Sequence, residues 1–488
     1  MTAFDDEALR EYDAACRLRF AIFFQRCFLM LNPGAIFEDN WSIDAMAAFA
    51  EQIINGDVRR GIVNIPPRHG KSQMFNVALC AFILGHDPRK RIFCISYAGP
   101  LSSEHANMFR AIVESAWYQR LFPRMKIKRI VDDEIYTTKR GYRRWTSVMG
   151  SMTGMGGDLF IVDDPIKPVD CLSQVKRDAV NQWFSNTLLS RLDNKETGAI
   201  LVVMQRLHMD DLSGFLLRNS DDWSHLNLPA VAEIPQDVPI GGGRVHRREV
   251  GDVLHPARES RETLDRQRQD MGSAIYSAHY QQRPIPLGGA LLLSEWFQYY
   301  TTLPERDETT YVIQSWDTAS KQGLLNSYSV CTTWLVHHET YYLIHVMRKR
   351  MTFPELVAAA QTLAQEYRPR HILIEDASTG AGLAQSIKSS HTMEVRLVTP
   401  EHNKDIRLFL QQPKFEQGRV YFPKYASWLR LFLEEMLSFP ESTHTDQVDS
   451  VSQALAFDAP GGYSAESIRG LESLVNGMYM GRLFGRMF

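Results

Sequence analysis

Cysteine pairs, a signal sequence and long apolar runs are what this sequence lacks. Its six cysteines lie apart, with no C-x-x-C spacing, which argues against a zinc site and against a disulfide scaffold. No apolar run approaches the length of a membrane span, and the start of the chain has no basic segment of the kind that opens a signal peptide. We therefore expect a cytosolic protein that does not enter a membrane.

An excess of charge of either sign is also missing, since the net charge is −3. This excludes little, because a protein that moves along DNA needs local basic patches rather than a basic total. The length of 488 residues favours two domains over one, and the apolar content of 44% is sufficient for each to bury a core. Composition and pattern predict a helical arm at 1–39, a nucleotide-binding domain at 40–228, a Pro- and Gly-rich linker subdomain at 229–300, a second domain at 301–460 and a tail at 461–488.

A phosphate-binding loop is indicated at residues 61–73, where an apolar strand ends at a Pro-Pro corner and Gly-Lys-Ser precedes a helical segment. Gly70 lets the backbone approach phosphate oxygens, Lys71 reaches the β and γ phosphates of ATP, and Ser72 is placed to ligate Mg²⁺. Ile65 stands where the usual signature has its first Gly. The predicted nucleotide-binding residues in this loop are Pro67, Arg68, His69, Gly70, Lys71, Ser72 and Gln73.

Two further strands supply the rest of the predicted ATP site. The strand at 159–162 ends in Asp163 and Asp164, of which the first is expected to hold Mg²⁺ and the second to polarise the attacking water. The strand at 199–204 leads to Arg206 and His208, which either sense the γ-phosphate or pair with nearby acids. Trp41, at the start of a helix before the loop, either contacts the nucleotide base or packs in the core. Alternating strands and helices predict a parallel sheet of α/β class.

The second half of the chain predicts a ribonuclease H-like order of elements: three antiparallel strands at 311–317, 328–336 and 341–347, then alternating helices and strands. Acidic residues stand at the ends of these elements. Together they can hold two divalent cations, one activating water and the other stabilising the leaving oxygen of a cleaved phosphodiester. The predicted ligands are Asp317, Glu375, Asp376, Asp446 and Asp449.

The motifs at 66–72, 152–158, 161–165 and 205–212 resemble those of the terminase large subunit of tailed phages, an ATP-driven motor and nuclease that packages viral DNA. The motifs at 374–380, 415–423 and 444–450, together with Asn403, Lys404 and Arg407, resemble its nuclease. The resemblance implies an N-terminal P-loop ATPase of the ASCE type with a parallel sheet, and a C-terminal ribonuclease H-like domain. It further implies ATP with Mg²⁺ in the first domain and two cations, Mg²⁺ or Mn²⁺, in the second.

Implied partners are double-stranded DNA, the portal protein of the procapsid and a small terminase subunit, with a homo-oligomeric ring on the portal and a monomer as one possible state in solution. The implied location is the host bacterial cytoplasm. By this resemblance Glu375 is preferred to Asp376 as first metal ligand, Asp446 is the ligand of the last motif with Asp449 supporting it, and Lys404 and Arg407 contact phosphate or are solvated surface. Thr445 replaces the first of a usual acid pair.

Met155 stands where the family often has an arginine that completes a neighbour's ATP site, so that role passes to Arg143, Arg144 or Arg68. Two other readings remain open at this stage. One is a repair or restriction helicase-nuclease, and the other is an inactive subunit that docks on the portal. The first would require further helicase motifs, and the sequence continues instead into a β-rich domain. Against the second stand the intact Gly-Lys-Ser and the complete set of acids.

Overall fold

The structure is a computed structural model that describes residues 6–97, 99–131, 134–150, 152, 154–285, 291–318, 328–376, 378–387, 393–441 and 445–457. The chain divides into two compact units, Met1–Pro286 and Leu287–Phe488, which are considered separately. The predicted tail at 461–488 lies outside the described residues. None of the helices in the described parts is long and apolar enough to cross a membrane.

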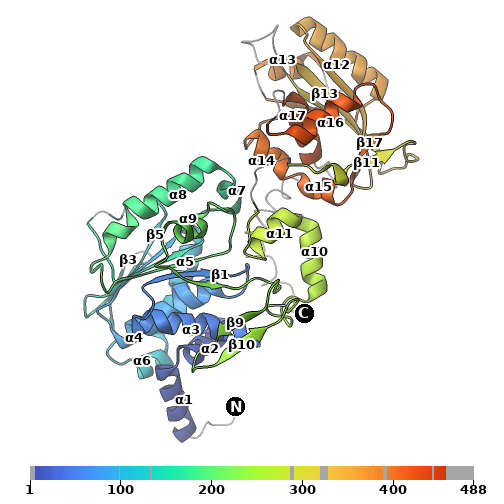
Figure 1. The fold of residues 1–488 in the computed structure, drawn as a ribbon. Coiled ribbons are helices and arrows are strands. Elements are labelled where there is room, and N and C mark those ends of the chain that lie inside the picture. Colours follow the sequence, from blue (N-terminus) through green and yellow to red (C-terminus); the bar gives the residue numbers. More distant parts are fainter. Residues whose placement is uncertain are drawn as a thin grey trace. The chain divides into compact units, whose positions relative to one another are not determined.

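The first unit is built on an eight-stranded sheet of order β3-β4-β5-β2-β6-β7-β1-β8 (Figure 1). All neighbouring strands from β5 to β8 are parallel, whereas β3, β4 and β5 pair antiparallel. The elements of this unit are α1 (Asp6–Leu18), α2 (Phe20–Leu31), α3 (Trp41–Asn55), β1 (Arg60–Asn64), η1 (Gln73–Leu79), α4 (Cys80–His86), β2 (Arg91–Ser96), α5 (Gly99–Glu114), α6 (Ala116–Leu121), β3 (Ile127–Val131), β4 (Glu134–Thr137), β5 (Tyr142–Ser147), β6 (Leu159–Asp163), α7 (Pro168–Cys171), α8 (Gln174–Asn186), η2 (Leu188–Arg191), β7 (Ala199–Met204), α9 (Leu212–Asn219), β8 (Ser224–Asn227), β9 (Gln236–Pro239), β10 (Val245–Arg248), α10 (Arg261–Met271) and α11 (Ser273–His279).

Helices cover both faces of this sheet, and successive residues of its strands alternate between two cores. On β6, Phe160 and Val162 pack with α7, α8 and α9, whereas Ile161 packs with α2 to α6. Because strands buried on both faces are apolar throughout, the runs at 91–97, 159–162 and 199–204 were recognisable in the sequence. The parallel α/β sheet predicted for the first half is confirmed.

Three local features of this unit are set by short-range contacts. The Asn40 side chain caps α3 by accepting a hydrogen bond from the Ser42 amide. The helix after the phosphate loop begins with the π-helical turn η1 before it becomes α4. The segment after β2 forms two helices, α5 and α6, with Ser115 capping the second.

The second unit contains a seven-stranded sheet of order β11-β17-β14-β13-β12-β15-β16. Strands β12, β13 and β14 are antiparallel neighbours, and β15 and β16 continue from β12 in parallel. The elements of this unit are η3 (Ser294–Trp296), β11 (Gln298–Tyr300), β12 (Tyr311–Asp317), β13 (Ser329–His337), β14 (Thr340–Lys349), α12 (Phe353–Tyr367), β15 (His371–Glu375), α13 (Ser378–Ser386), β16 (Glu394–Val398), α14 (Lys404–Phe409), α15 (Gln412–Glu416), β17 (Val420–Pro423), α16 (Leu429–Ser438) and α17 (Asp446–Ala456).

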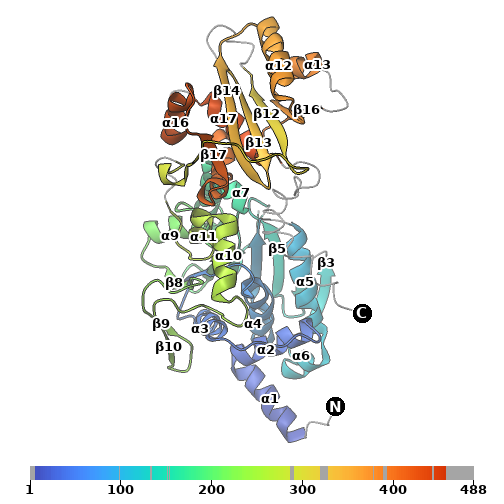
Figure 2. The same ribbon diagram turned by 90° about the vertical axis from the view of Figure 1, so that its right-hand side faces the viewer.

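Helices α12 and α13 lie on one face of this sheet, and α16 and α17 lie on the other (Figure 2). Trp316 and Cys331 pack with α12 and α13 in one core. On the opposite face, the Ser450 hydroxyl of α17 donates to the Ser315 carbonyl at 2.8 Å and accepts from the Thr332 amide at 3.1 Å. These hydrogen bonds tie α17 directly to the backbone of β12 and β13. The predicted order of three antiparallel strands followed by alternating helix and strand is confirmed.

Candidate nucleotide and metal sites

The phosphate loop connects β1 to η1 and has a left-handed backbone at Arg68 (φ 69°) and Gly70 (φ 76°). The loop places Lys71 in a buried position, with 4% of its surface exposed. Its ammonium donates to Gln205 Oε1 at 3.0 Å and pairs with Asp164 Oδ2 at 3.0 Å. Since Gln205 follows β7 and Asp164 follows β6, Lys71 links the ends of β7, the neighbour of β1, and β6, the next strand along.

Asp163 is buried at the end of β6, and only one of its two carboxylate oxygens has a hydrogen-bond partner. Its Oδ2 accepts from Asn76 Nδ2 at 2.7 Å, while Oδ1 has no hydrogen-bond partner. Burial, aided by the negative charge of Asp164, raises the pKa of Asp163 to about 7, against the lowering effects of Lys71 and of the Ser72 hydroxyl. An orphaned buried oxygen beside a hydroxyl fits a divalent cation, which would supply the missing positive charge.

Asp164 adopts a backbone conformation that is unusual for a residue other than glycine, with φ 42°. Its amide donates to the Val203 carbonyl at 3.0 Å, so the turn after β6 is tied to β7. A strained residue held in this way is typical of functional sites. Here it directs the Asp164 carboxylate at the Lys71 ammonium.

Arg206 and His208 are held within their own loop. Arg206 Nε donates to both oxygens of Asp211 at 3.0 Å, and the amide of Asp210 donates to His208 Nδ1 at 3.0 Å. The structure therefore favours the structural alternative for both side chains over the γ-phosphate sensor. The residue of this strand end that reaches Lys71 is Gln205, to which the sequence motifs assign no role.

Trp41 contacts side chains of β10. Its ring stacks on His246 with centroids 4.4 Å apart, and the Arg248 guanidinium lies 5.1 Å from the ring centroid. This arrangement favours the packing alternative over contact with a base.

The three candidate arginines for a neighbour's ATP site differ in accessibility. Arg143 is 0% exposed, and its Nε donates to the Asn76 carbonyl at 3.2 Å, so its assignment to a neighbouring subunit is wrong. Arg144 pairs with Glu134 at 2.6 Å and also contacts the Met155 sulfur. Arg68 belongs to the phosphate loop itself.

The acids of the second unit come together at one edge of its sheet. Asp317 ends β12, Glu375 ends the neighbouring β15, and Asp446 and Asp449 lie in the first turn of α17. Burial, together with the negative charges of Asp449, Glu375 and Asp446, raises the pKa of Asp317 well above its usual range. Four carboxylates therefore act on one another, as the sequence predicts.

Asp376 does not join this cluster. Its carboxylate is exposed and accepts from the Thr399 hydroxyl at 3.3 Å, beyond β16. Since successive side chains of a strand point to opposite faces, Glu375 and Asp376 cannot both face Asp317. The structure thus favours Glu375 as the metal ligand and leaves Asp376 outside the site.

Two cations of α14 hold the acid cluster in the absence of metal. Arg407 donates to Asp449 Oδ1 at 2.6 Å and to Glu375 Oε2 at 3.2 Å, and Lys404 pairs with Asp449 Oδ2. Asp449 is 2% exposed, and its burial raises its pKa although both cations lower it. Asp449 is thus neutralised by protein side chains, whereas Asp317 and Asp446 have no ion pair with Lys or Arg among the described residues.

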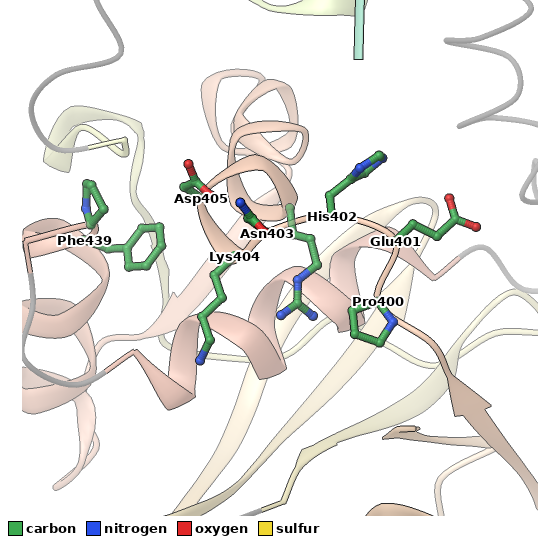
Figure 3. Close-up of a pocket in the computed structure, with 9 residues that line it drawn as sticks. Pro400, Glu401, His402, Asn403, Lys404, Asp405 and Phe439 are labelled. Atoms are coloured by element: carbon green, nitrogen blue, oxygen red, sulfur yellow. The ribbon is translucent and has the colours of Figure 1, made fainter. Parts of the chain in front are cut away.

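An open cavity of about 600 Å³ adjoins these cations, between α14 and the segment at Phe439 and Pro440. In the close-up, the Lys404 side chain extends away from the carboxylates of Asp405 and Glu401 (Figure 3). A cavity lined by Lys404 and Arg407 next to an acid cluster can receive a phosphodiester. The ligand set of the cluster itself is all oxygen, which suits hard divalent cations such as Mg²⁺ or Mn²⁺.

Comparison with known proteins gives one family match, over residues 314–457, to the terminase RNaseH-like domain. Solved structures similar to this chain include the large terminase of the thermophilic bacteriophage D6E, with 10% identity, a TM-score of 0.48 and coverage of 83% of this chain and 98% of that one. The D6E protein has also been solved with ADP and with ATP-gamma-S. The large terminase of bacteriophage HK97 has 10% identity, a TM-score of 0.38 and coverage of 90% and 99%. The large terminase nuclease of thermophilic phage G20c with bound cobalt has 15% identity, a TM-score of 0.27 and coverage of 35% and 98%. No curated protein matches.

Proposed function

We infer the function of this chain from its resemblance to terminase large subunits, which the motifs predict and which the match of residues 314–457 to the terminase RNaseH-like domain supports. A terminase acts in packaging viral DNA. We propose that the first unit hydrolyses ATP to translocate double-stranded DNA into a procapsid. The second unit would cleave the concatemeric DNA endonucleolytically with two metal ions.

The ATPase proposal rests on the contacts of Lys71. Ser72 and Asp163 would hold Mg²⁺, which would supply positive charge to neutralise the nucleotide's phosphates. In the structure, Lys71 is paired with Asp164 at 3.0 Å. A phosphate that attracts Lys71 would release the Asp164 carboxylate, which then accepts a hydrogen bond from the attacking water. The ion pair with Lys71 would thus keep the Asp164 carboxylate from accepting a hydrogen bond from water before ATP binds. Gln205 would remain bonded to the Lys71 ammonium while its ionic partner changes from Asp164 to phosphate.

The nuclease proposal rests on one observation above all, the mutual repulsion of Asp317, Glu375, Asp446 and Asp449 at the edge of a ribonuclease H-like sheet. Such a cluster is stable when cations share it. Asp317, Glu375 and Asp446 would hold two metal ions, which activate water and stabilise the leaving oxygen. Lys404 and Arg407 would exchange part of their pairing with Asp449 for the backbone phosphate of the DNA.

The proposed partners follow the resemblance: a portal protein, a small terminase subunit and further copies of this chain in a ring around the DNA, in the cytoplasm of the host bacterium. Arg144 and Arg68 remain the candidates for the arginine that completes a neighbour's ATP site.

Plasmid cleavage tests the nuclease half of the proposal with a matched pair of variants. Purified full-length protein is incubated with plasmid and either Mg²⁺ or Mn²⁺. We expect Asp317→Ala to abolish cleavage and Asp376→Ala to retain it, because the Asp376 carboxylate contacts Thr399 instead of the cluster. Equal loss in both variants, or unchanged cleavage by Asp317→Ala, would reject the assigned site.

A further inference from the structure

Asp307, His337 and His338 form a compact polar cluster in the second unit. Asp307 Oδ2 lies 3.1 Å from His338 Nε2, and Asp307 Oδ1 lies 3.6 Å from His337 Nδ1. One ligand atom from each of the three residues lies within 4.8 Å of the other two. No other group of three such residues in the described parts of the chain meets this condition.

The cluster is built where a tight turn meets the segment before β12. β13 ends at His337 and β14 begins at Thr340, so His338 and Glu339 alone form the turn, with φ 45° and 59°. Turns of this type normally contain Asn and Gly, so a pair of other residues here is strained. From this turn, the His338 ring reaches Asp307.

The carboxylate of Asp307 is itself fixed from its other side. Its Oδ1 accepts from the Thr309 amide at 2.9 Å and from the Thr310 hydroxyl at 2.9 Å. The Thr310 hydroxyl also lies 3.0 Å from His337 Nδ1. The carboxylate and the first ring are therefore already oriented, and a cation would replace the contact between Thr310 and His337 and that between Asp307 and His338.

The spacing suits a tetrahedral transition-metal ion. Bonds of about 2.0–2.1 Å to nitrogen and carboxylate oxygen place ligand atoms about 3.3 Å apart. The separations of 3.1 Å from Asp307 Oδ2 to His338 and 3.6 Å from Asp307 Oδ1 to His337 bracket this value. Two imidazoles and one carboxylate favour Zn²⁺ and similar borderline ions, whereas the acid cluster offers only oxygen. Three protein ligands leave a fourth position for water.

This cluster lies away from the acids. Tyr311 at the start of β12 pairs with Val336, and Asp317 at its end pairs with Val330. At about 3.3 Å per residue, the two ends of β12 are about 20 Å apart. A cation here would not take part in cleavage.

We propose that Asp307, His337 and His338 bind a divalent transition-metal ion of the Zn²⁺ type, which clips the segment before β12 to the turn between β13 and β14. The inference is independent of the proposed ATPase and nuclease activities. A cluster held by hydrogen bonds alone is the alternative.

Cobalt titration tests the proposal on full-length, tag-free protein. The background carries Asp317→Asn and Asp446→Asn, so that the acid cluster binds metal weakly, and nucleotide is omitted. We expect one equivalent of Co²⁺ to give the strong visible absorption of a tetrahedral ion, and Zn²⁺ to displace it. His338→Gln should lower the affinity for Co²⁺ about 10-fold or more, since it removes a ligand.

Glu339→Gln is the matched control, because it changes the other turn residue and keeps all three ligands. It should bind Co²⁺ as the parent does. A second readout is thermal unfolding, because Zn²⁺ should raise the unfolding temperature of the parent and not that of His338→Gln. The His338 side chain is 63% exposed and contributes little packing, so the substitution itself should change stability little. No visible absorption in the parent, or equal affinity in parent and His338→Gln, would overturn the proposal.

Discussion

Replacing Asp317 by Asn is expected to stabilise the second unit while abolishing cleavage. Burial and the charges of Asp449, Glu375 and Asp446 disfavour the ionised Asp317 carboxylate, so its pKa is raised well above the usual range. Each unit by which that pKa is raised corresponds to about 1.4 kcal/mol of unfavourable interaction. A neutral Asn should therefore increase the free energy of unfolding when metal is absent.

The sign of the pH dependence follows from the direction of the shift. A carboxyl group whose pKa is raised in the folded state binds more protons folded than unfolded, so its contribution to stability is lost as the pH rises through the folded pKa. The advantage of Asp317→Asn should accordingly be absent below the unfolded pKa of about 4 and grow as the pH rises. Metal should stabilise the wild type and have little effect on the variant.

Asp449→Asn provides a comparison. Asp449 is 2% exposed and is paired with Arg407 and Lys404. Burial raises its pKa but the two cations lower it, so Asn at position 449 should stabilise the unit less than Asn at position 317.

Thermal unfolding with chelator present, followed by tryptophan fluorescence, to which the buried Trp316 and Trp334 of the second unit contribute, measures both variants. For a domain of this size, each gain of about 1.4 kcal/mol corresponds to a rise of roughly 3–6 °C. Destabilisation by Asp317→Asn would refute the reasoning.

Two further predictions concern the ATP site. Because the pKa of Asp163 is raised to about 7, ATPase activity at subsaturating Mg²⁺ should rise as the pH passes through about 7, and a flat profile would contradict this. Between pH 4 and 7, metal-free Asp163→Asn protein should lose less stability than the metal-free wild type. The difference in the free energy of unfolding should be at most about 4 kcal/mol. Gln205→Met removes the neutral acceptor of Lys71 at similar volume, and loss of a hydrogen bond to a charged group, worth about 1.5–3 kcal/mol, should lower kcat/KM for ATP about 10- to 100-fold. Steady-state ATPase kinetics measure this effect, and a change of less than about twofold would show that Gln205 is dispensable.

The sequence predicts those parts of the fold that depend on local pattern. The apolar runs of β2, β6 and β7 and the strand order β12 to β14 are visible because their side chains are buried throughout or flanked by turns. The antiparallel strands β3 and β5 were missed, since Ile127–Val131 and Tyr142–Ser147 are rich in basic residues and lie near or at the edge of the sheet. Their pairing depends on neighbouring strands rather than on their own composition.

In the candidate sites, too, local sequence pattern predicts some residues, and tertiary packing determines others. Motif spacing points to Lys71, which lies in the loop after β1, and to Asp163 and Asp317, which end β6 and β12. It does not identify Asn76, which lies one helical turn after Ser72 and bonds to Asp163, nor the role of Gln205. The choice between Glu375 and Asp376 was accessible in principle, because side chains alternate along β15. The burial of Arg143 depends on how β5 packs against α5 and η1, which no local pattern contains.

The central claim is that one chain carries two separable catalytic sites. It is tested most directly by measuring ATPase activity and metal-dependent plasmid cleavage on the same samples of wild type, Lys71→Ala and Asp317→Ala. We expect Lys71→Ala to lose ATPase activity and still cut DNA, and Asp317→Ala to do the reverse. Loss of both activities in either variant, with the fold intact, would contradict the account.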